Sequence, residues 1–528
     1  MKTKITFILC VALIVAIMPL SAAKYYLYTG STNPWGTPAD ATAVTQVSDI
    51  STTLNGYATN DVVWIAAGTY TISAAIAPKT GMQIYGGFVG TESVLTDRIV
   101  LDADGNGVKE PWEFSNPTVI NGSGFSGTSV AYSVFNSSTA AYTLNGVTID
   151  GHKTSYTTGG GIYTNGLSFI TNCIVRNINH TGTNGGAIFS NGTGGATITG
   201  CLIENCVSSG NGAGICANRK ITVKQCIIRN NYVSGVSSKG GGIYLGNTAD
   251  ASNTTNVVNN AIYNNTALQG GAIYIADVSA TVNIINNTIV NNYATAGNGN
   301  GGIIGIALGQ KIYNNVLYNN LENGTNVRNL RGSGTGTLDI QYCAYNAGEY
   351  PVTGTVYGTV ANITDLSTPD FVQPSTTTGY TAPMPTDVKI ANFAISSTSA
   401  LKDMGALSST LSVVPAIDLL GKTRPDKSTG DIGAYEYGAS LATSWSSVNF
   451  KDNSIFVYKN HSNQIEITIP TEIVGKASIS IFNTTGQKLE NKYLTSEATA
   501  LNNSFSAGVY LVSMLVNGKT TTRKVVIN

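Results

Sequence analysis

This chain of 528 residues is poor in charged residues. Only 11% of its residues are Asp, Glu, Lys or Arg, whereas globular chains carry roughly 25%. The 29 basic and 29 acidic side chains cancel, so the chain lacks the positive field that nucleic-acid-binding proteins use, and we expect no nucleic-acid partner. Three histidines leave no basis for a His-rich zinc site.

Long apolar runs are also scarce, and the one present lies at the N-terminus. Residues 5–18 are apolar, Lys2 and Lys4 precede them, and Ser21-Ala22-Ala23 follows. This is the layout of a secretory signal peptide, so we expect residues 1–23 to be removed on export. A retained membrane anchor would need about 20 apolar residues. We expect no transmembrane segment in the mature chain.

Glycine is abundant, with 59 residues, and it marks a repeat. The first repeated block, GGGIY at 159–163, recurs at intervals of 26 to 31 residues. Its isoleucines are Ile162, Ile188, Ile215, Ile243, Ile273 and Ile304. A second block alternates with it: NCIVRN at 172–177, GCLIEN at 200–205, QCIIRN at 225–230, NAIYNN at 260–265, NTIVNN at 287–292 and NVLYNN at 315–320. The register holds over about 200 residues, which is typical of a repeat architecture.

These blocks predict an all-β fold. Each is short, rich in β-branched or aromatic residues and bounded by Gly and Asn, so it is typical of a strand between turns. One such turn cannot bury its own face, but parallel stacking of turns makes a continuous core. We therefore expect a right-handed parallel β-helix, a solenoid like that of pectate lyases. It would comprise an N-terminal cap at 24–60, the helix at 61–345 with an inserted loop at 102–113, and its C-terminal part and cap at 346–438.

Two columns of residues follow from aligning the second block. One lies at a turn and contains Asn177, Asn205, Asn230, Asn265, Asn292 and Asn320. We expect it to be structural, because Asn tolerates left-handed backbone and stacked amides can hydrogen-bond from turn to turn. The other points inward and contains Cys173, Cys201, Cys226, Ala261, Thr288, Val316 and Cys343.

The seven cysteines do not form a clear disulfide framework. Cys10 lies in the signal peptide, and four others share the inward column, where their side chains all point the same way. That direction suits a disulfide poorly even at a turn spacing of about 4.8 Å. We expect buried free thiols there, and the disulfide state of Cys206 and Cys216 stays open.

Part of the chain resembles a known class of secreted protein. IYGGFVGTES at 84–93, the Gly-Gly-Ile turns and DIGAYE at 431–436 are similar to the secreted right-handed β-helix proteins common in Bacteroidetes, relatives of the polymorphic outer-membrane protein type. The resemblance covers roughly residues 24–438. It implies the fold much more than an activity.

After a Ser-rich linker at 439–455, residues 456–528 alternate like strands. NTTGQ at 483–487, FSAGVYLV at 505–512, NGK at 517–519 and RKVVI at 523–527 resemble the type A C-terminal sorting domain of the type IX secretion system. The resemblance implies a small β-sandwich that engages the secretion machinery and is usually cleaved. The protein would then be secreted or attached to the cell surface at the outer membrane. The alternative is an ordinary terminal β-sandwich module.

An acidic loop gives a metal hypothesis. Residues 102–113, DADGNGVKEPWE, satisfy the calcium-loop pattern D-x-[DN]-x-[DN]-G-x5-E. The predicted Ca²⁺ ligands are the side chains of Asp102, Asp104, Asn106, Glu110 and Glu113 and the backbone carbonyl of Val108. Pro111 and the strand-like flanks argue against this pattern, and the alternative is a solvated acidic turn.

The sequence does not support catalysis. A glycoside hydrolase needs converging carboxylates, and no such pair stands out among the repeats. Arg176, Glu204 and Arg229 share one predicted outward column, and the next members of that column are Asn264, Asn291 and Asn319. Asp150, His152 and Lys153 lie together but in a turn-like segment, so we interpret them as a solvated loop rather than a site. A polysaccharide lyase or glycoside hydrolase is the alternative reading.

An aromatic strip favours binding. Tyr163, Phe189, Tyr244 and Tyr274 each follow an inward isoleucine, so strand alternation points them outward, with Cys216 interrupting the column. Such a strip can pack against sugar rings, and its alternative is a self-stacking ladder that shields the sheet. Three hypotheses remain: a surface adhesin or glycan-binding scaffold, a carbohydrate-active enzyme, and a purely structural surface protein.

Overall fold

The computed structural model describes residues 22–438 and 456–527, apart from short internal stretches. These stretches are 126–132, 156–158, 247–253, 277–278, 280, 347–348, 351–354, 358–360, 407–413, 425–428, 460–463, 469–475, 484–486, 496–497, 505–507 and 517–518. Nearly all of the predicted signal peptide and the whole predicted linker at 439–455 lie outside the described residues. Within the described part, no helix has the length and apolar character needed to cross a membrane.

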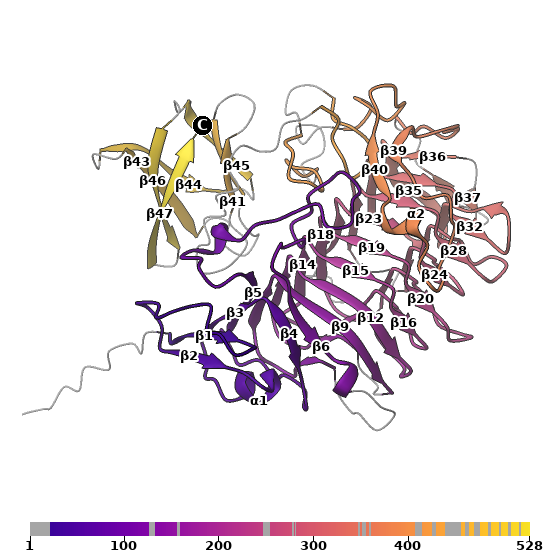
Figure 1. Ribbon diagram of the computed structural model, residues 1–528. Coiled ribbons are helices and arrows are strands. Elements are labelled where there is room, and N and C mark those ends of the chain that lie inside the picture. The colour runs from indigo at the N-terminus through magenta and orange to yellow at the C-terminus, as the bar shows by residue number, and fades with distance from the viewer. Residues whose placement is uncertain are drawn as a thin grey trace, which may run out of the picture.

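The chain winds into a parallel β-solenoid with three long sheets, which confirms the predicted fold class (Figure 1). Sheet A has 13 described strands, in the order β2 (Ala43–Gln46), β1 (Lys24–Tyr28), β3 (Val62–Ala66), β5 (Gln83–Phe88), β8 (Tyr142–Asn145), β11 (Ser168–Thr171), β14 (Ala196–Thr199), β18 (Ile221–Lys224), β22 (Thr255–Val258), β26 (Val282–Ile285), β30 (Lys311–Tyr313), β35 (Gly336–Gln341) and β38 (Thr355–Tyr357). Sheet C has nine described strands, in the order β7 (Phe135–Ser137), β10 (Ile162–Thr164), β13 (Ile188–Ser190), β17 (Ile215–Ala217), β21 (Ile243–Leu245), β25 (Ile273–Ile275), β29 (Ile303–Ile306), β34 (Leu330–Gly332) and β37 (Glu349–Tyr350).

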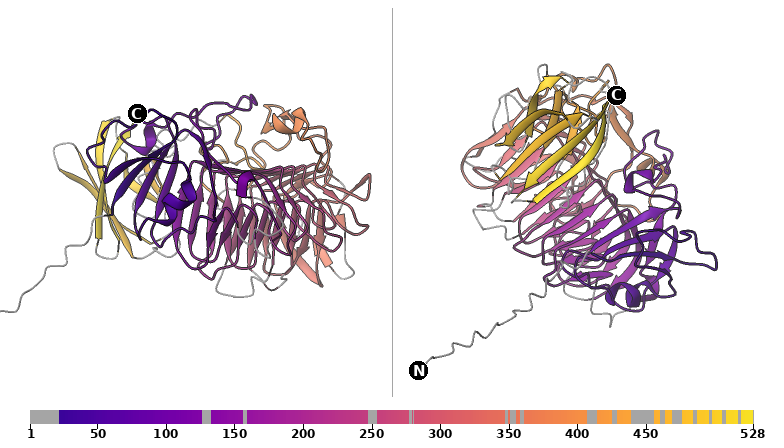
Figure 2. Two further views of the ribbon diagram at one scale, coloured as in Figure 1. Left: turned by 60° about the horizontal axis from the view of Figure 1, so that its bottom comes forward. Right: turned by 90° about the vertical axis from the view of Figure 1, so that its left-hand side faces the viewer.

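Sheet B has 16 described strands and carries the site considered below. They are β4 (Gly68–Thr71), β6 (Thr118–Asn121), β9 (Val147–Thr154), β12 (Ile174–His180), β15 (Leu202–Glu204), β16 (Val207–Ser208), β19 (Ile227–Arg229), β20 (Tyr232–Val233), β23 (Ala261–Tyr263), β24 (Thr266–Ala267), β27 (Thr288–Val290), β28 (Tyr293–Ala294), β31 (Val316–Tyr318), β32 (Leu321–Glu322), β33 (Asn326–Val327) and β36 (Ala344–Tyr345). The left view of Figure 2 shows the turns stacked along the solenoid.

Two short elements lie at the N-terminal end. Strands β1 and β2, from the predicted cap, extend the edge of sheet A. Helix α1 (Ile50–Asn55) begins after Asp49, whose carboxylate accepts the N–H groups of Ser51 and Thr52, the usual way of satisfying free donors at a helix start. Ile50 and Leu54 of α1 join the core, so the helix closes that end of it. The 3₁₀ helices η1 (Leu95–Asp97) and η2 (Ser123–Phe125) lie in connections.

The inward isoleucine column is confirmed, with one correction. Ile162, Ile188, Ile215, Ile243 and Ile273 pair successively and are buried. The next member is Ile303, not the predicted Ile304, which pairs with outward Tyr274. Both candidates are isoleucines, so the sequence letters alone do not separate them. A one-residue slip in a strand reverses the face to which every side chain points.

The same kind of slip affects the predicted asparagine and cysteine columns. The left-handed turn column is correct for Asn177, Asn205 and Asn230 but continues through Asn264, Asn291 and Asn319, each with φ between 50° and 58°. The prediction placed Asn265, Asn292 and Asn320 there. Strand pairing of Ile227 with Ala261, and of Arg229 with Tyr263, fixes this register. The outward charged column therefore continues from Arg229 to Tyr263, not to Asn264 as predicted.

The displaced asparagines form a buried amide ladder. Asn292 Nδ2 donates to Ile262 O at 2.9 Å and to Asn320 Oδ1 at 2.9 Å, and Asn292 Oδ1 accepts the N–H of Asn265 at 3.1 Å. Asn231, Asn265 and Asn320 repeat the arrangement. A second ladder of Asn260, Asn287 and Asn315 lies at the other end of the sheet B strands. The ladders satisfy buried backbone groups at the corners, which would otherwise be costly.

Cysteines occupy these ladders in the earlier turns, and Cys343 does so in the turn after Asn315. Cys226 N donates to Asn260 Oδ1 at 2.9 Å, and Cys206 N donates to Asn231 Oδ1 at 3.1 Å. Cys173, Cys201, Cys226 and Cys343 thus share a column with Asn260, Asn287 and Asn315, rather than with the predicted Ala261, Thr288 and Val316. All six described cysteines, including Cys206 and Cys216, are buried and free, which confirms the expected thiols of the column.

Beyond the repeats, the chain folds back over sheet B as a segment that we call the C-terminal strap, residues 371–437. It contains β39 (Phe371–Gln373), helix α2 (Thr386–Lys389) and β40 (Asn392–Ile395), coloured orange in Figure 1. Asparagines with a left-handed backbone conformation hydrogen-bond to the backbone of the strap through their side-chain amides. Asn230 donates to Thr381 O and accepts from Thr381 N, both at 2.9 Å. Asn314 makes the same pair of bonds with Ala406 at 3.0 and 2.9 Å.

An apolar cluster lies between the strap and sheet B, and a buried ion pair lies within the strap itself. The cluster joins sheet B to the strap and comprises Leu202, Ile227, Ala261, Tyr263, Val290, Val388, Ala391, Phe393, Leu419, Ala434 and Tyr435, with Trp112 from the acidic loop. Arg424 pairs with Glu436 at 2.8 Å, with both side chains buried. Burial raises the pKa of Glu436 to about 7, despite the opposing effect of Arg424, and burial also raises the pKa of Asp418 and Asp431.

The C-terminal unit is all-β, as predicted, and its strands form two antiparallel sheets. One sheet comprises β41 (Phe456–Lys459), β42 (Gln464–Thr468) and β45 (Ala498–Ser504). The other comprises β44 (Lys488–Leu494), β43 (Ala477–Asn483), β46 (Gly508–Val516) and β47 (Lys519–Ile527). Ile479 and Ile481 on β43, and Val512 and Met514 on β46, are buried, and they lie at alternate positions of their strands.

Replacing Asn292 by Ala should destabilise the solenoid by about 3 kcal/mol, because several buried amide and carbonyl groups lose their partners at once. The measurement is the urea or thermal unfolding midpoint. Asn191→Ala is the matched control, since Asn191 is a half-buried turn residue outside both ladders, and we expect its effect to stay within about 0.5 kcal/mol. Equal midpoints for the two variants would contradict the role of the ladder.

Stability should fall as pH rises through the titration of Glu436. Its pKa is 4.5 when unperturbed and about 7 in the fold, so the folded state holds the proton more tightly. The contribution is full below pH 4.5 and is lost as pH approaches 7, with a size on the order of 3 kcal/mol. We expect Glu436→Gln to reduce the difference between the melting temperatures at pH 5 and pH 8. An unchanged difference would argue against this assignment.

Candidate metal centre

The acidic loop projects from the connection between β5 and β6 and lies on the outer face of sheet B. Its ends pair as a short ribbon, with Leu101 N donating to Glu113 O at 2.9 Å and Ser115 N donating to Ile99 O at 2.8 Å. Trp112 packs in the apolar cluster beneath the strap. The flanks are therefore strand-like, as the sequence indicated, and the loop does not lie between two helices.

Asp102 and Asn106 are used to shape the loop. Asp102 Oδ1 accepts the N–H of Gly105 at 2.9 Å, and Oδ2 accepts that of Gly107 at 3.1 Å. Asn106 Oδ1 accepts the N–H of Val108 at 2.8 Å. Gly105 and Gly107 have φ of 79° and 82°, a backbone region that favours glycine. These side chains organise turns by capping backbone donors.

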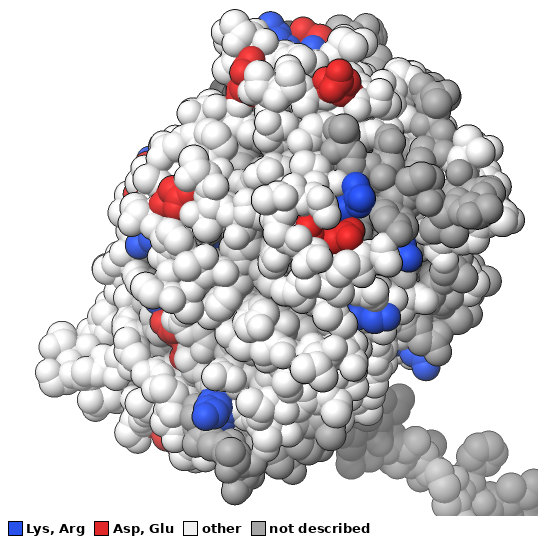
Figure 3. Space-filling view, turned by 90° about the vertical axis from the view of Figure 1, so that its right-hand side faces the viewer, with Lys and Arg blue, Asp and Glu red and all other residues white. Residues whose placement is uncertain are grey.

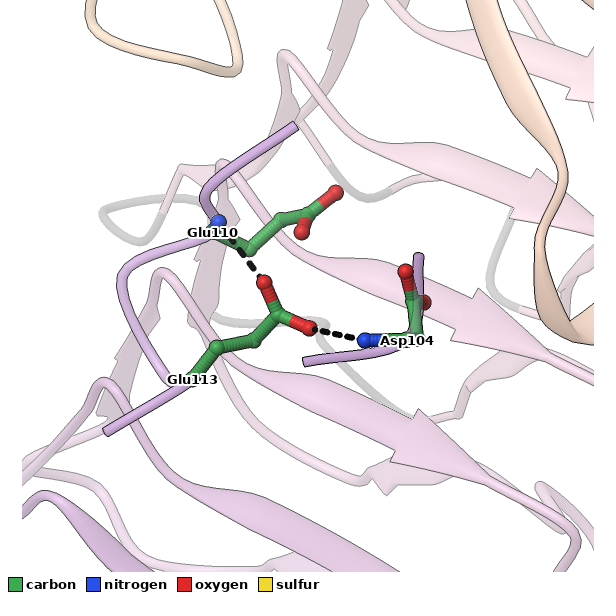
Figure 4. A group of neighbouring side chains, drawn as sticks. All are labelled: Asp104, Glu110 and Glu113. Carbon is green, nitrogen blue, oxygen red and sulfur yellow. Dashed lines mark hydrogen bonds between the residues drawn. The ribbon is translucent and has the colours of Figure 1, made fainter. Parts of the chain in front are cut away.

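Three of the six predicted ligands converge. Asp104, Glu110 and Glu113 each bring one carboxylate oxygen within 4.8 Å of the others, as Figure 4 shows. Glu113 is anchored by three backbone donors: Oε1 accepts from Ala103 and Asp104, each at 3.1 Å, and Oε2 accepts from Glu110 at 3.2 Å. This triad could hold a metal ion.

Glu110 is the least satisfied member of the triad. Its side chain is 2% exposed, Oε1 accepts from Asn106 Nδ2 at 2.9 Å, and Oε2 has no hydrogen-bond partner. Burial raises the pKa of Glu110 to about 9, and the neighbouring Glu113 and Asp104 add to the rise. Burial also raises the pKa of Asp104, against the opposing charge of Arg229. A proton or a cation would relieve this accumulation of negative charge.

Arg229 connects the triad to the rest of the fold. Its Nε donates to Glu204 Oε2 at 2.9 Å, and its Nη1 lies 3.6 Å from Asp104 Oδ2. The same Nη1 donates to Tyr263 OH at 3.0 Å and to the strap carbonyl of Lys389 at 2.6 Å. Sequence reasoning placed Arg229 and Glu204 in one column but missed this role, because the strap and the loop are distant in sequence. The rarity of charge was the one available signal.

The other charged group that the sequence placed together is Asp150, His152 and Lys153, whose side chains have different surroundings. Asp150 pairs with Arg176 at 2.8 Å and accepts from Asn177 Nδ2 at 2.7 Å. His152 is buried, with its ring stacked on Phe125 at 5.5 Å, while Lys153 is exposed. The three side chains therefore diverge. On the face shown in Figure 3, charged side chains are few and scattered.

The aromatic column of sheet C has the predicted register. Tyr163, Phe189, Cys216, Tyr244 and Tyr274 pair in that order. Tyr163, Tyr244 and Tyr274 are half-buried, whereas Phe189 and Cys216 are buried at 2% and 0% exposure. The rings of Tyr244 and Tyr274 stack with centroids 5.7 Å apart and an interplanar angle of 7°. Lys239 Nζ donates to Tyr274 OH at 2.8 Å.

Comparison with known proteins identifies one end of the chain. Residues 460–528 match the family described as the secretion system C-terminal sorting domain. The comparison with curated proteins finds no match. The match covers β42 to β47, the antiparallel unit, and agrees with the resemblance of the same strands to type IX sorting domains. The protein is therefore a secreted β-solenoid protein that is exported by the type IX secretion system through its C-terminal sorting domain.

Proposed function

We propose that the protein is a cell-surface adhesin or glycan-binding scaffold that presents the outer face of sheet C to polysaccharide. The aromatic column supports this most directly. Tyr244 and Tyr274 are aligned, parallel and half-exposed, so their combined surface suits the apolar face of a sugar ring. Tyr163 lies three strands away along the same column, and buried Phe189 serves as packing between them rather than as a ligand contact.

Polar groups beside the column support a sugar ligand further. Asn211, Lys239 and Gln269 lie in the adjoining corners, where successive turns are linked by Gly212 N to Lys239 O at 2.9 Å and Gly240 N to Gln269 O at 3.0 Å. Amide and ammonium groups next to an aromatic face supply the directional hydrogen bonds that sugar hydroxyls need.

After export, we propose that the mature chain is displayed at the outer membrane or released, following removal of an N-terminal signal peptide and of the sorting domain.

We further propose that the acidic triad binds Ca²⁺. The donors are carboxylates, the hard oxygen ligands that calcium takes at 2.3–2.6 Å. Calcium accepts irregular oxygen sets, whereas Mg²⁺ demands near-octahedral geometry, which a loop fixed by Glu113 and its backbone donors does not readily supply. The proposed protein ligands are the three converging carboxylates, whereas the side chains of Asp102 and Asn106 cap backbone groups.

Substituting both Tyr244 and Tyr274 by Ala should weaken polysaccharide binding at least about tenfold, because two ring contacts are lost. Binding is measured by pull-down on a panel of plant, algal and host polysaccharides, with chain length followed in the same samples. Tyr493→Ala, which removes an exposed ring of the sorting domain, is the control. Undiminished binding by the double variant would refute the strip, and shortened chains would identify a lyase or hydrolase instead.

Calcium should raise the melting temperature of the EDTA-treated full chain, because an ion that binds the native state stabilises it. Glu113→Gln should abolish most of this shift, while an equal concentration of Mg²⁺ should produce a smaller one. Titration calorimetry checks the stoichiometry. If Mg²⁺ and Ca²⁺ gave equal shifts, the assignment of the ion as calcium would be wrong.

Removing residues 456–528 should block passage across the outer membrane, because the sorting domain directs that step. In a host with a type IX system, we expect the truncated chain to accumulate in the periplasm, detected by immunoblot of cell fractions. Tyr493→Ala in the full chain is expected to be exported normally. Appearance of the truncated chain in the medium or on the surface would show a second export signal.

A further inference from the structure

A segment distant in sequence buries the acidic loop. In the strap, Asn392 Nδ2 donates to the backbone oxygen of Asn106 at 3.1 Å. Trp112 of the loop packs in one cluster with Val388 and Phe393 of the strap. Glu110 and Glu113, the two buried carboxyl groups of the loop, therefore belong to a segment that contacts both sheet B and the strap.

The charge enclosed there is unbalanced. Three carboxyl groups converge in the triad, and Glu204 faces the same guanidinium as Asp104. Among the ion pairs of the described residues, Arg229 is the one cation that reaches this group. Glu110 Oε2 lies in it without a hydrogen-bond partner, on a side chain that is 2% exposed. A buried carboxylate in this state is costly, so docking of the strap favours any cation that enters among the three carboxyl groups.

Arg229 connects cation binding in the loop to docking of the strap. One guanidinium nitrogen faces Asp104 and also donates to Lys389 O at the end of α2. A cation bound to Asp104 draws that carboxylate away from its contact with Arg229. The N–H donors of Arg229 then stay directed at Glu204, Tyr263 and the strap. The contacts of Asn392 and Trp112 connect the same two segments independently.

We propose that a divalent cation bound by Asp104, Glu110 and Glu113 fastens the C-terminal strap to sheet B, so that ion binding and strap docking strengthen each other. This inference rests on the proposed calcium site and adds its ligand set and its role. Asp102, the first position of the sequence pattern, is not a ligand. Because such coupling is reciprocal, the ion must tighten the strap by the same factor as the docked strap tightens the ion.

Hydrogen exchange of the full chain tests the first direction. In peptides covering residues 386–395, we expect exchange to slow about tenfold when Ca²⁺ replaces EDTA, within the usual range of coupling between two sites. Glu110→Gln preserves the shape and the bond from Asn106 but removes the charge, so its exchange should no longer depend on Ca²⁺. Asp102→Asn, the same change in the same loop, keeps one oxygen to cap the backbone, and its exchange should still slow when Ca²⁺ replaces EDTA.

Ion affinity tests the reverse direction, with Tb³⁺ luminescence sensitised by Trp112 and Ca²⁺ competition as the probe. Asn392→Ala, which touches none of the three carboxylates, should weaken binding several-fold. Ser396→Ala, in the same strap, removes a hydroxyl that bonds to Thr398, and should not weaken binding.

Each contrary outcome refutes a separate statement. If the chain binds the ion but strap exchange is unchanged, the coupling is wrong and the calcium site stands. If the unmodified chain binds no ion, both are wrong. If Asp102→Asn behaves like Glu110→Gln, the ligand set is wrong. None of these results bears on polysaccharide binding by sheet C.

Discussion

Every turn of the solenoid takes its position from the turn before it, through parallel strand pairing in a fixed register and through side-chain ladders at the corners. The isoleucine column supplies apolar burial, worth roughly 1.5–3 kcal/mol for each buried side chain. The amide ladders satisfy corner groups that pairing leaves over, as when Asn292 bonds to the turns on both sides of it. Because each turn repeats this arrangement, a residue type that recurs at one position of the repeat becomes a column along the solenoid. The aromatic residues of sheet C and the asparagines that hold the strap are both such columns.

Although charged residues are scarce in this chain, several of the buried ones gather in one region of the fold. Several buried acidic groups lie under the strap or within it, close to Arg229 or to Arg424. A buried ion pair contributes little net stability, because desolvation offsets most of the attraction, but breaking one is costly. The arrangement is therefore better suited to specifying how the strap docks than to strengthening the fold. The apolar cluster of Trp112, Phe393 and Tyr435 supplies the attraction, and the charged groups restrict it to one alignment.

The repeats in the sequence were sufficient to predict the solenoid, most of the isoleucine column and the free thiols, and strand alternation with a family resemblance predicted the small all-β C-terminal unit. The predicted register was wrong where two neighbouring residues were equally suited to the same position. In the doublet Asn264-Asn265, either residue tolerates a left-handed turn, and only strand pairing decides that Asn264 takes it. The acidic loop was found from its pattern, but the pattern did not indicate that Asp102 caps the backbone N–H groups of Gly105 and Gly107. The strap contacts join residues that are distant in sequence, such as Asn230 and Thr381, which lie 151 positions apart, and no local signal encodes such pairs.

The three sheets differ in what they leave accessible, and this difference separates the two proposed roles. The strap and the acidic loop cover the outer face of sheet B. Part of sheet A is also covered, since Ile285 and Tyr313 pack against Ala406 and Val414, and Arg98 bonds to Asn145. The aromatic column of sheet C keeps three half-exposed tyrosines. An ion that fastens the strap therefore acts on a face that a glycan on sheet C does not touch. Its effect on binding would have to pass through the stacked turns, which hold one rigid register, so the scaffold and the binding strip are expected to behave as independent parts of one molecule.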